Sequence, residues 1–347
     1  MFDFADIITF TSVFELIFFI VFISFKSFKP YFNKVLALFF LTQMLGILFW
    51  IIKKHQINTP LTQILSAFSL LWAPSLFLYA EALTKKKEKP SKLDILHTIP
   101  FLTVLLYFSA QLFCQLPKIQ FGILLNTQVI VYNIVGIIIL IRYHYRVKEN
   151  FSNDESKTRK WVAVALIGYM VACFTPSVLS LLNVVPNPSS VLKNVIEFLP
   201  FLIFFNILFV NAVENPVVVH ELPNEERYKG SNLSDNLAQE YLKKLDHTVE
   251  KEKCYLEPEL SLGNLSEISG IPSRYLSQII NQYKGKTFYD YINGLRVKHA
   301  CNLLITDERK TVLEILYESG FNSKTSFNTS FKKHTGQSPS EYKASFK

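Results

Sequence analysis

The chain has 347 residues, of which 50% are hydrophobic and 14% aromatic, and it carries a formal net charge of +8. This length allows two or three domains. The charge is unevenly placed, with +8 in residues 1–213, −5 in residues 214–259 and +5 in residues 260–347. The four cysteines show no paired spacing, which argues against a disulfide framework or a zinc site, and we expect no cofactor.

Up to about residue 213 the chain consists of apolar runs separated by short polar joints. Each run is near the roughly 20 residues that cross a hydrocarbon core. Stretches such as 121–141 and 195–213 are apolar around the whole helix, whereas a helix of a soluble core is apolar on one stripe. We therefore predict seven transmembrane helices. Their expected ranges are 7–25, 35–52, 61–83, 93–114, 121–141, 161–184 and 194–213.

The polar joints predict an orientation, because Lys and Arg are enriched in cytoplasmic loops. The first, third and fifth joints together carry 14 basic residues, and the even joints carry four. The N-terminus is then outside and residue 347 inside. The outward joints, 53–60, 115–120 and 185–193, are too short for a sensor domain. Any signal must therefore enter the helix bundle, or come from the lipid or from a partner protein.

Two carboxylates fall within predicted spans, Glu15 and Glu197. An ionisable group inside a membrane is costly and is a candidate functional group by default. We interpret both as candidates for intramembrane sensing. The alternative is structural pairing with a neighbouring helix, or placement near the end of a span.

A helix-turn-helix pattern begins after Leu260. Leu262, Leu265 and Ile268 are expected to share one helical face, and Gly270 supplies the backbone freedom of a tight corner. The helix expected over 273–283 would bury its apolar side chains against that face.

A second helix-turn-helix pattern follows a predicted continuous helix over 288–305. Here Ile315 lies on the first helix, Gly320 in the turn, and Phe331 on a second helix over 323–334. Two such units in tandem predict an all-α domain after the membrane helices.

Over residues 255–346 this arrangement resembles the AraC/XylS family of transcription regulators. The departures are Ser266 and Leu316, where a small Ala is usual, and Pro272, where the family often has a capping Ser. The second unit carries the most specific part of the resemblance. Its matching residues are Gly320, Phe321, Asn322, Ser323, Phe327, Phe331, Lys332, Lys333, His334, Gly336, Ser338, Pro339 and Tyr342.

The resemblance implies that two recognition helices enter the major groove of double-stranded DNA. Arg suits guanine and Gln suits adenine, each by two hydrogen bonds, whereas Lys contacts to phosphate position the protein without reading sequence. The residues expected to contact bases are Arg274, Ser277, Gln278, Lys324, Thr325, Asn328 and Thr329. Those expected to contact phosphates are Ser323, Lys284, Lys332 and Lys333.

An amphipathic helix is expected over 231–253. Its apolar stripe consists of Leu233, Leu237, Leu242, Leu245 and Val249. Two interpretations remain open. The stripe forms a homodimer that reports the state of the bundle, or it packs on the chain's own DNA-binding domain.

These patterns predict three parts: a seven-span transmembrane domain over 1–213, a linker with the amphipathic helix over 214–254, and a DNA-binding domain over 255–347. The favoured function is a non-enzymatic, membrane-embedded transcription regulator of a bacterial inner membrane, with its DNA-binding domain in the cytoplasm and an unknown ligand or membrane partner. A transporter, or a membrane tether, that carries a regulatory DNA-binding domain is the alternative.

Overall fold

The computed structural model describes residues 4–25, 31–54, 60–85, 87–117, 119–152, 157–181, 190–214, 233–307 and 309–346. Its elements there are helices, and pairing of the β type is limited in these ranges to one bridge between Phe151 and Ser261. The predicted all-α class is therefore confirmed. The chain divides into two compact units, Met1–Ile141 with Lys157–Val219 and Arg142–Ser156 with His220–Lys347.

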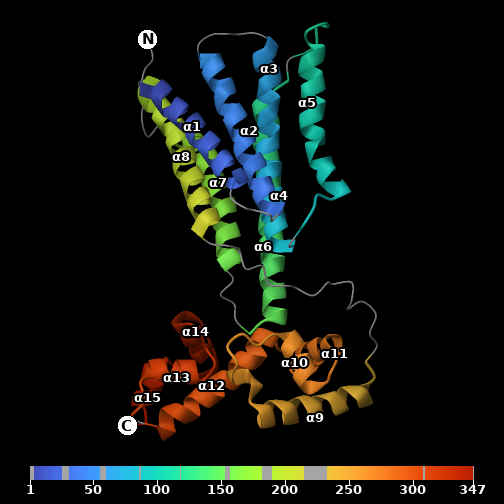
Figure 1. Ribbon diagram of the computed structural model, residues 1–347, viewed down its shortest axis with the longest axis vertical. Coiled ribbons are helices and arrows are strands. Elements are labelled where there is room, and N and C mark those ends of the chain that lie inside the picture. The colour runs from blue at the N-terminus through green and yellow to red at the C-terminus, as the bar shows by residue number, and fades with distance from the viewer. Residues whose placement is uncertain are drawn as a thin grey trace. The chain divides into compact units, whose positions relative to one another are not determined.

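The first unit is a bundle of apolar helices (Figure 1). The expected span over 61–83 is built from three successive helical segments, and the last helical segment of the expected span over 93–114 ends at Ala110. The elements, with the end of α6 belonging to the second unit, are α1 (Phe4–Phe25), α2 (Tyr31–Lys54), α3 (Pro60–Ser66), the 3-10 helix η1 (Ala67–Leu71), α4 (Trp72–Lys85), the 3-10 helix η2 (Lys92–Thr98), α5 (Ile99–Ala110), α6 (Phe121–Asn150), α7 (Lys157–Leu181) and α8 (Ser190–Glu214).

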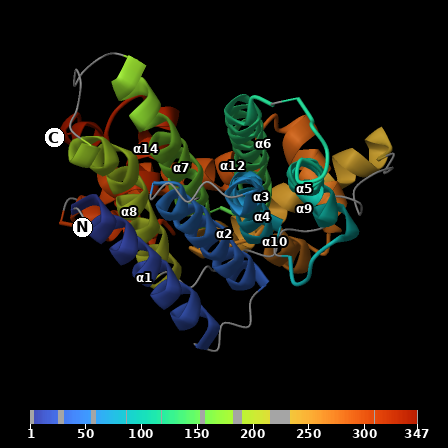
Figure 2. The same cartoon turned by 90° about the horizontal axis from the view of Figure 1, so that it is seen from above.

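Aromatic side chains fill the interior of this bundle. Figures 1 and 2 show α1 beside both α2 and α8. Phe19 of α1 stacks on Phe209 of α8, with ring centroids 4.0 Å apart and planes 9° apart. Helices α2 and α4 approach closely because Gly46 has no side chain where the Trp72 indole lies, and that indole N–H donates to the carbonyl oxygen of Thr42 at 2.9 Å.

Five described helical segments are long and apolar enough to cross a membrane: Ile7–Ser24, Tyr31–Ile52, Thr62–Lys85, Lys92–Ala110 and Phe121–Asn150. Two shorter apolar stretches, Val162–Thr175 and Val195–Val210, coincide with the last two expected spans. The apolar helices agree with membrane association. The count of seven stays a prediction.

The two carboxylates singled out in this bundle lie on different helices. Glu15 is on α1 and interacts with Asn206 of α8, the kind of pairing between helices that was the alternative to a sensing role. Glu197 is half-buried on α8. Their roles in sensing stay predictions.

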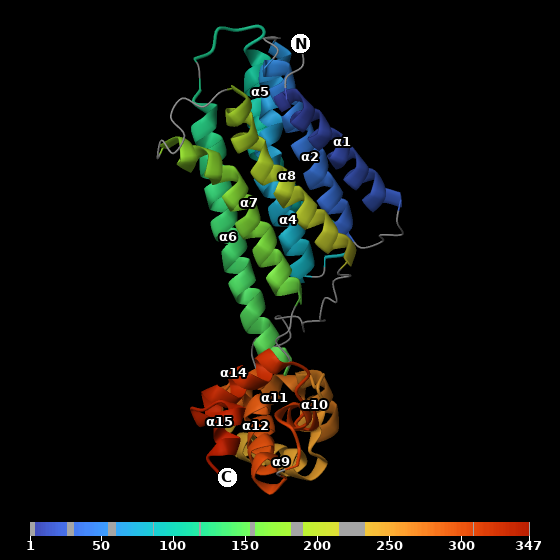
Figure 3. The same ribbon diagram turned by 90° about the vertical axis from the view of Figure 1, so that its left-hand side faces the viewer.

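The second unit is organised around one long helix, α12 (Figure 3). The N-terminal half of α12 packs in one small core and its C-terminal half in another. Phe288 and Ile292 face the first core, and Val297 and Leu304 face the second. The elements are α9 (Asp235–Glu252), the 3-10 turn η4 (Cys254–Leu256), α10 (Leu262–Ser269), α11 (Ser273–Gln278), the π-helical turn η5 (Ile279–Tyr283), α12 (Phe288–Thr306), α13 (Val312–Glu318), α14 (Lys324–Thr335) and α15 (Pro339–Ala344).

At the end of α6, the compact units differ from the expected domain boundaries. Residues 142–156 were assigned to the transmembrane domain, but they pack with the C-terminal unit. The end of α6 is therefore part of the same compact body as the helix-turn-helix elements.

Candidate DNA-binding surface

The first helix-turn-helix half consists of α10, its turn and α11. Ser261 caps α10, since its Oγ accepts the backbone N–H of Asn264 at 3.1 Å. Gly270 then adopts a left-handed conformation with φ of 63°, which a residue with a Cβ adopts only at a cost. Leu265, Leu276 and Ile279 are fully buried between the two helices.

One expected core residue of this half is not in the core. Ile268 is 48% exposed, and Ser269 is buried instead. Two successive steps of three residues move the side chain about 120° around a helix with 3.6 residues per turn, so position 268 has left the face that holds Leu262 and Leu265. The expectation that Ile268 faces inward was wrong.

The departures from the family pattern in this half have local consequences. Pro272 stands at the N-cap of α11 and provides no side-chain hydrogen bond there. Ser266 uses its hydroxyl to donate to the carbonyl oxygen of Ile271 at 2.6 Å, which ties α10 to the turn. The Ser266 hydroxyl therefore helps to fix the turn between α10 and α11.

The outer face of α11 presents the expected base-contacting residues. Arg274 is exposed, and Ser277 and Gln278 are half-exposed. The Arg274 guanidinium lies 4.4 Å from the Tyr275 ring centroid and donates to the Tyr275 hydroxyl at 2.8 Å. Gln278 donates to Gln282 at 3.1 Å. Surface hydrogen bonds of this kind contribute only about 0.5–1.5 kcal/mol each, so they leave both side chains able to take other partners.

The second half consists of α13, its turn and α14. Thr311 and Glu314 form a reciprocal cap at the start of α13, and Ser323 caps α14 by accepting the N–H of Ser326 at 3.2 Å. Phe327 and Phe331 are fully buried, with ring centroids 5.5 Å apart. Burial of these two rings confirms the expected inner face of α14.

Gly320 is required in the second turn. Its φ is 81°, and a Cβ placed there would lie 2.7 Å from the Leu256 carbonyl oxygen and 2.8 Å from that of Tyr255. The turn therefore packs directly on the backbone of η4.

The polar residues expected on α14 lie together on its outer face. Lys324, Thr325, Asn328 and Thr329 are all exposed, on the side of the helix away from Phe327. Their positions on the N-terminal half of α14 match the part of a recognition helix that meets base edges.

Of the three lysines expected to contact phosphates, Lys284 and Lys333 form ion pairs within the unit, and Lys332 is exposed. Lys284 pairs with Asp246 of α9 at 2.9 Å, and Lys333 pairs with Asp290 of α12 at 2.7 Å. Burial raises the pKa of Asp290, but the hydrogen bond and charge of Lys333 outweigh it and leave that pKa below its usual value. Exposed ion pairs contribute about 0–1 kcal/mol, so a phosphate can compete for these lysines.

A buried arginine that the sequence did not single out holds the unit together. Arg296 of α12 is 2% exposed, and its guanidinium donates to the carbonyl oxygens of Tyr255 and Glu257, each at 2.6 Å. It also donates to Ser152 Oγ at 3.0 Å. Burial lowers the Arg296 pKa to about 10, which still leaves the group charged at neutral pH.

Ser152, two residues beyond α6, is bound from both sides. Its backbone N–H and its hydroxyl both donate to the Leu260 carbonyl oxygen, at 3.1 and 2.8 Å. Its own carbonyl accepts from the Asn293 side chain at 3.0 Å. In the last turn of α6, the Lys148 ammonium lies 5.3 Å from the Tyr289 ring centroid. Residues 148–152 therefore form a docking segment on the helix-turn-helix unit.

The amphipathic stripe of α9 faces the same unit. Leu245 and Val249 are buried in one core with Leu265 and Ile279, and Leu233 and Leu242 pack partly buried against that core, while Leu237 is half-buried. A homodimer through this stripe would require the two buried side chains to leave that core. The contacts of Leu245 and Val249 support packing of the stripe on its own domain, and a homodimer through the stripe stays a prediction.

Comparisons with known proteins agree with this geometry. Residues 265–345 match the family described as helix-turn-helix domain, of the AraC type. An uncharacterized HTH-type transcriptional regulator of Staphylococcus aureus (strain COL) is 30% identical over 127 residues, which are 36% of this chain and 16% of that protein. The HTH-type transcriptional regulator GlxA of Rhizobium meliloti (strain 1021) is 29% identical over 91 residues, which are 26% of this chain and 28% of that protein.

The chain thus spans 16% of the first relative's length and 28% of the second's. No solved structure matches the chain significantly. The similarity concerns the DNA-binding part, and residues 265–345 form a helix-turn-helix domain.

Proposed function

We propose, from the helix-turn-helix domain at residues 265–345, that this chain is a membrane-embedded transcription regulator that binds specific DNA sequences. The observation that carries the proposal is the pair of recognition helices. In both α11 and α14 the inner face is apolar and buried, and the outer face presents residues with the hydrogen-bonding groups that read base edges.

The proposed roles of single residues follow from their side chains. Arg274 would donate two hydrogen bonds to guanine, and Gln278 would pair with adenine. On α14, Asn328 has the same bidentate capacity toward adenine, and Lys324, Thr325 and Thr329 surround it. Lys332 and Lys333 at the end of α14, and Lys284 after α11, would meet phosphates, as would the Ser323 hydroxyl.

The membrane part of the proposal has support in the first unit. Apolar helices of spanning length alternate with joints whose basic residues are concentrated in the odd-numbered ones, which favours seven spans with the N-terminus outside. The same count would place the DNA-binding unit in the cytoplasm, where bacterial DNA is accessible.

A route from the membrane to the DNA is proposed through α6. This helix is continuous from Phe121 to Asn150, and Ser152 just beyond it is fixed to Arg296 and Leu260. A movement of α6 would therefore act on Leu260, directly before the first helix-turn-helix half. The acidic linker before α9 would not be needed to transmit it.

The function is tested by selecting bound sequences from a random DNA pool with the full chain in lipid nanodiscs. We expect a recurrent motif with two sub-sites about one helical turn apart. The double variant Arg274→Ala with Asn328→Ala should lose the motif and retain weak binding to all DNA. If the full chain enriches no motif, the proposal is wrong. Transport of solute in vesicles would instead support a transporter.

A further inference from the structure

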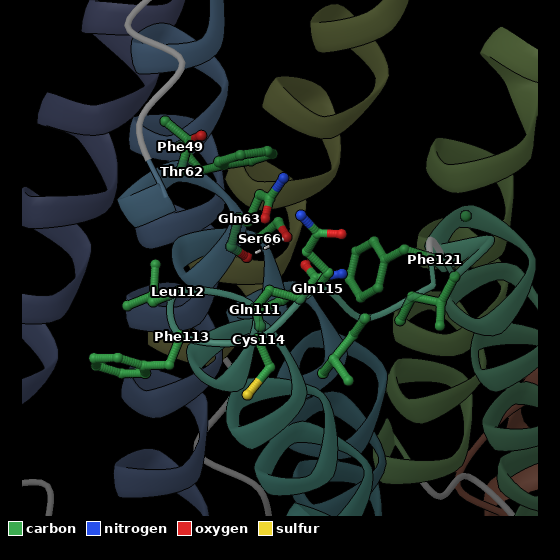
Figure 4. Close-up of a pocket in the computed structure, with 14 residues that line it drawn as sticks. Phe49, Thr62, Gln63, Ser66, Gln111, Leu112, Phe113, Cys114, Gln115 and Phe121 are labelled. Atoms are coloured by element: carbon green, nitrogen blue, oxygen red, sulfur yellow. Dashed lines mark hydrogen bonds between the residues drawn. The ribbon is translucent and has the colours of Figure 1, made fainter.

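A pocket of about 970 Å³ lies in the first unit, where α2 ends, α3 begins and α5 passes into α6 (Figure 4). Phe49 lines it from α2, Gln63 from α3, and Phe121 from the first turn of α6. The turn after α5 contributes the remaining wall. By the proposed topology these helix ends face outward, so the pocket would be reached from outside the cell.

The lining combines amide groups with aromatic rings. Figure 4 shows the side chains of Gln63, Gln111 and Gln115 gathered beside the Phe121 ring, with Ser66 next to Gln63. None of the described lining residues is charged. A charged ligand would lose its hydration here without gaining a counter-charge, which is costly. The pocket therefore favours an uncharged ligand.

From the chemistry of the described lining residues, we propose that this pocket binds a short, uncharged peptide with apolar side chains. A glutamine side chain offers one carbonyl acceptor and an NH₂ donor, the same pair that a peptide group needs from a partner. Apolar side chains of the ligand would lie against rings such as Phe49 and Phe121, and a few well-placed polar groups would set its orientation. Three amides in one pocket match a ligand with repeated amide groups.

The pocket has a direct connection to the proposed output. Phe121 and Gly122 line it and also begin α6, the helix that ends next to Ser152 and Arg296. A ligand that shifts the start of α6 would thereby change the docking segment. This consequence rests on the proposed function, whereas binding of the peptide does not.

Cys114 provides a reporter for the experiment, since it lines the pocket and is exposed, while the other three cysteines are buried or half-buried. Full chain in nanodiscs is treated with a charged maleimide, and modification of Cys114 is followed by mass spectrometry. The probe is a pool of N-acetylated, C-amidated tetrapeptides of apolar residues. At ten times the dissociation constant about a tenth of the pockets stay open, so labelling should slow about tenfold.

Matched variants locate the binding. Gln115→Leu and Gln63→Leu should each abolish the protection of Cys114. Gln120→Leu should retain it, because Gln120 is exposed and is not among the lining residues. The proposal is overturned if the peptide pool leaves the labelling rate unchanged, if both pocket variants keep full protection, or if maltotriose protects Cys114 and the peptides do not.

Binding to the selected DNA motif is measured in the same nanodiscs. DNA binding without peptide protection would overturn the pocket proposal and leave the proposed function standing. Peptide protection without any DNA motif would overturn the proposed function and leave the pocket proposal standing. We expect the peptide pool to change DNA affinity by about fivefold or more, the lower end of the roughly 5- to 150-fold couplings typical between sites, and this change should disappear in Gln115→Leu.

Discussion

The first helix-turn-helix half, α10 with α11, is covered by α9, whereas the second half, α13 with α14, packs on α12 through its own aromatic side chains. Helix α9 covers the first half, through the core around Leu245 and through the ion pair of Lys284 with Asp246. In the second half, Phe321, Phe327 and Phe331 form a chain of edge-on ring contacts that continues to Tyr342.

This difference suggests a division of labour between the two halves. The docking segment 148–152 contacts Leu260 and Ser261, directly before α10, so a signal from the membrane would reach the first half first.

Replacement of Arg296 should have the largest effect. In Arg296→Met the carbonyl oxygens of Tyr255 and Glu257 lose their donor, and unsatisfied buried acceptors cost about 1–3 kcal/mol each. We expect the unit to lose about 3 kcal/mol of stability and the docking segment to detach. Hydrogen–deuterium exchange of the full chain should show faster exchange at residues 148–152 and 255–260. The exposed Arg309→Met is the control, and equal exchange in both variants would contradict the role given to Arg296.

The two turn glycines should respond unequally to alanine. Both have positive φ, which costs a residue with a Cβ about 1–2 kcal/mol. In Gly270→Ala the new methyl would meet only the flexible end of Lys244, at 3.2 Å, so no further loss is expected. In Gly320→Ala it would meet backbone oxygens at 2.7 and 2.8 Å, and the loss should be larger. Chemical denaturation followed by far-ultraviolet circular dichroism would measure the loss of unfolding free energy. Equal losses in the two variants would show that the η4 backbone moves aside without cost.

Base-contact variants should separate the halves by sequence position. Arg274→Ala and Asn328→Ala should each cost about 1–3 kcal/mol on the selected motif and relax preference at different base pairs. Binding is measured by fluorescence anisotropy against single-base variants of the motif. If both substitutions relaxed the same position, the two helices would not read separate sub-sites.

The smallest effect is expected from the lysines at the end of α14. Lys332→Ala should lower the slope of affinity against salt by about one. Lys333→Ala should lower it less, because Lys333 must first leave Asp290, which lies 2.7 Å away. Titrations over a range of salt concentrations measure both slopes. A larger change for Lys333 would mean that its ion pair does not survive on DNA.

Much of the second unit could be predicted because its signals are local. The Gly320 turn, the Ser323 cap and the inner face with Phe327 and Phe331 lie within a few residues of one another. Ile268 was misplaced because three-residue spacing drifts around a helix. In the first unit, apolar runs predicted the helices but gave no sign of the pocket, which forms where separate helix ends meet.

Contacts between distant residues could not be predicted. Arg296 and Ser152 are 144 positions apart, and no periodicity connects them. The ion pairs of Lys284 and Lys333 are likewise made by carboxylates 38 and 43 positions away. The stripe of α9 was ambiguous for a related reason, since an amphipathic helix shows the same pattern whichever apolar surface covers it.

The most direct test of the central claim is a hydroxyl-radical footprint of the full chain, in nanodiscs, on its selected DNA. We expect two protected segments about one helical turn apart on one face of the duplex, because α11 and α14 would each enter a major groove. Arg274→Ala should weaken protection of one segment and Asn328→Ala that of the other. A single protected segment, or protection that is equal on unrelated DNA, would contradict a membrane-embedded regulator that reads DNA with both recognition helices.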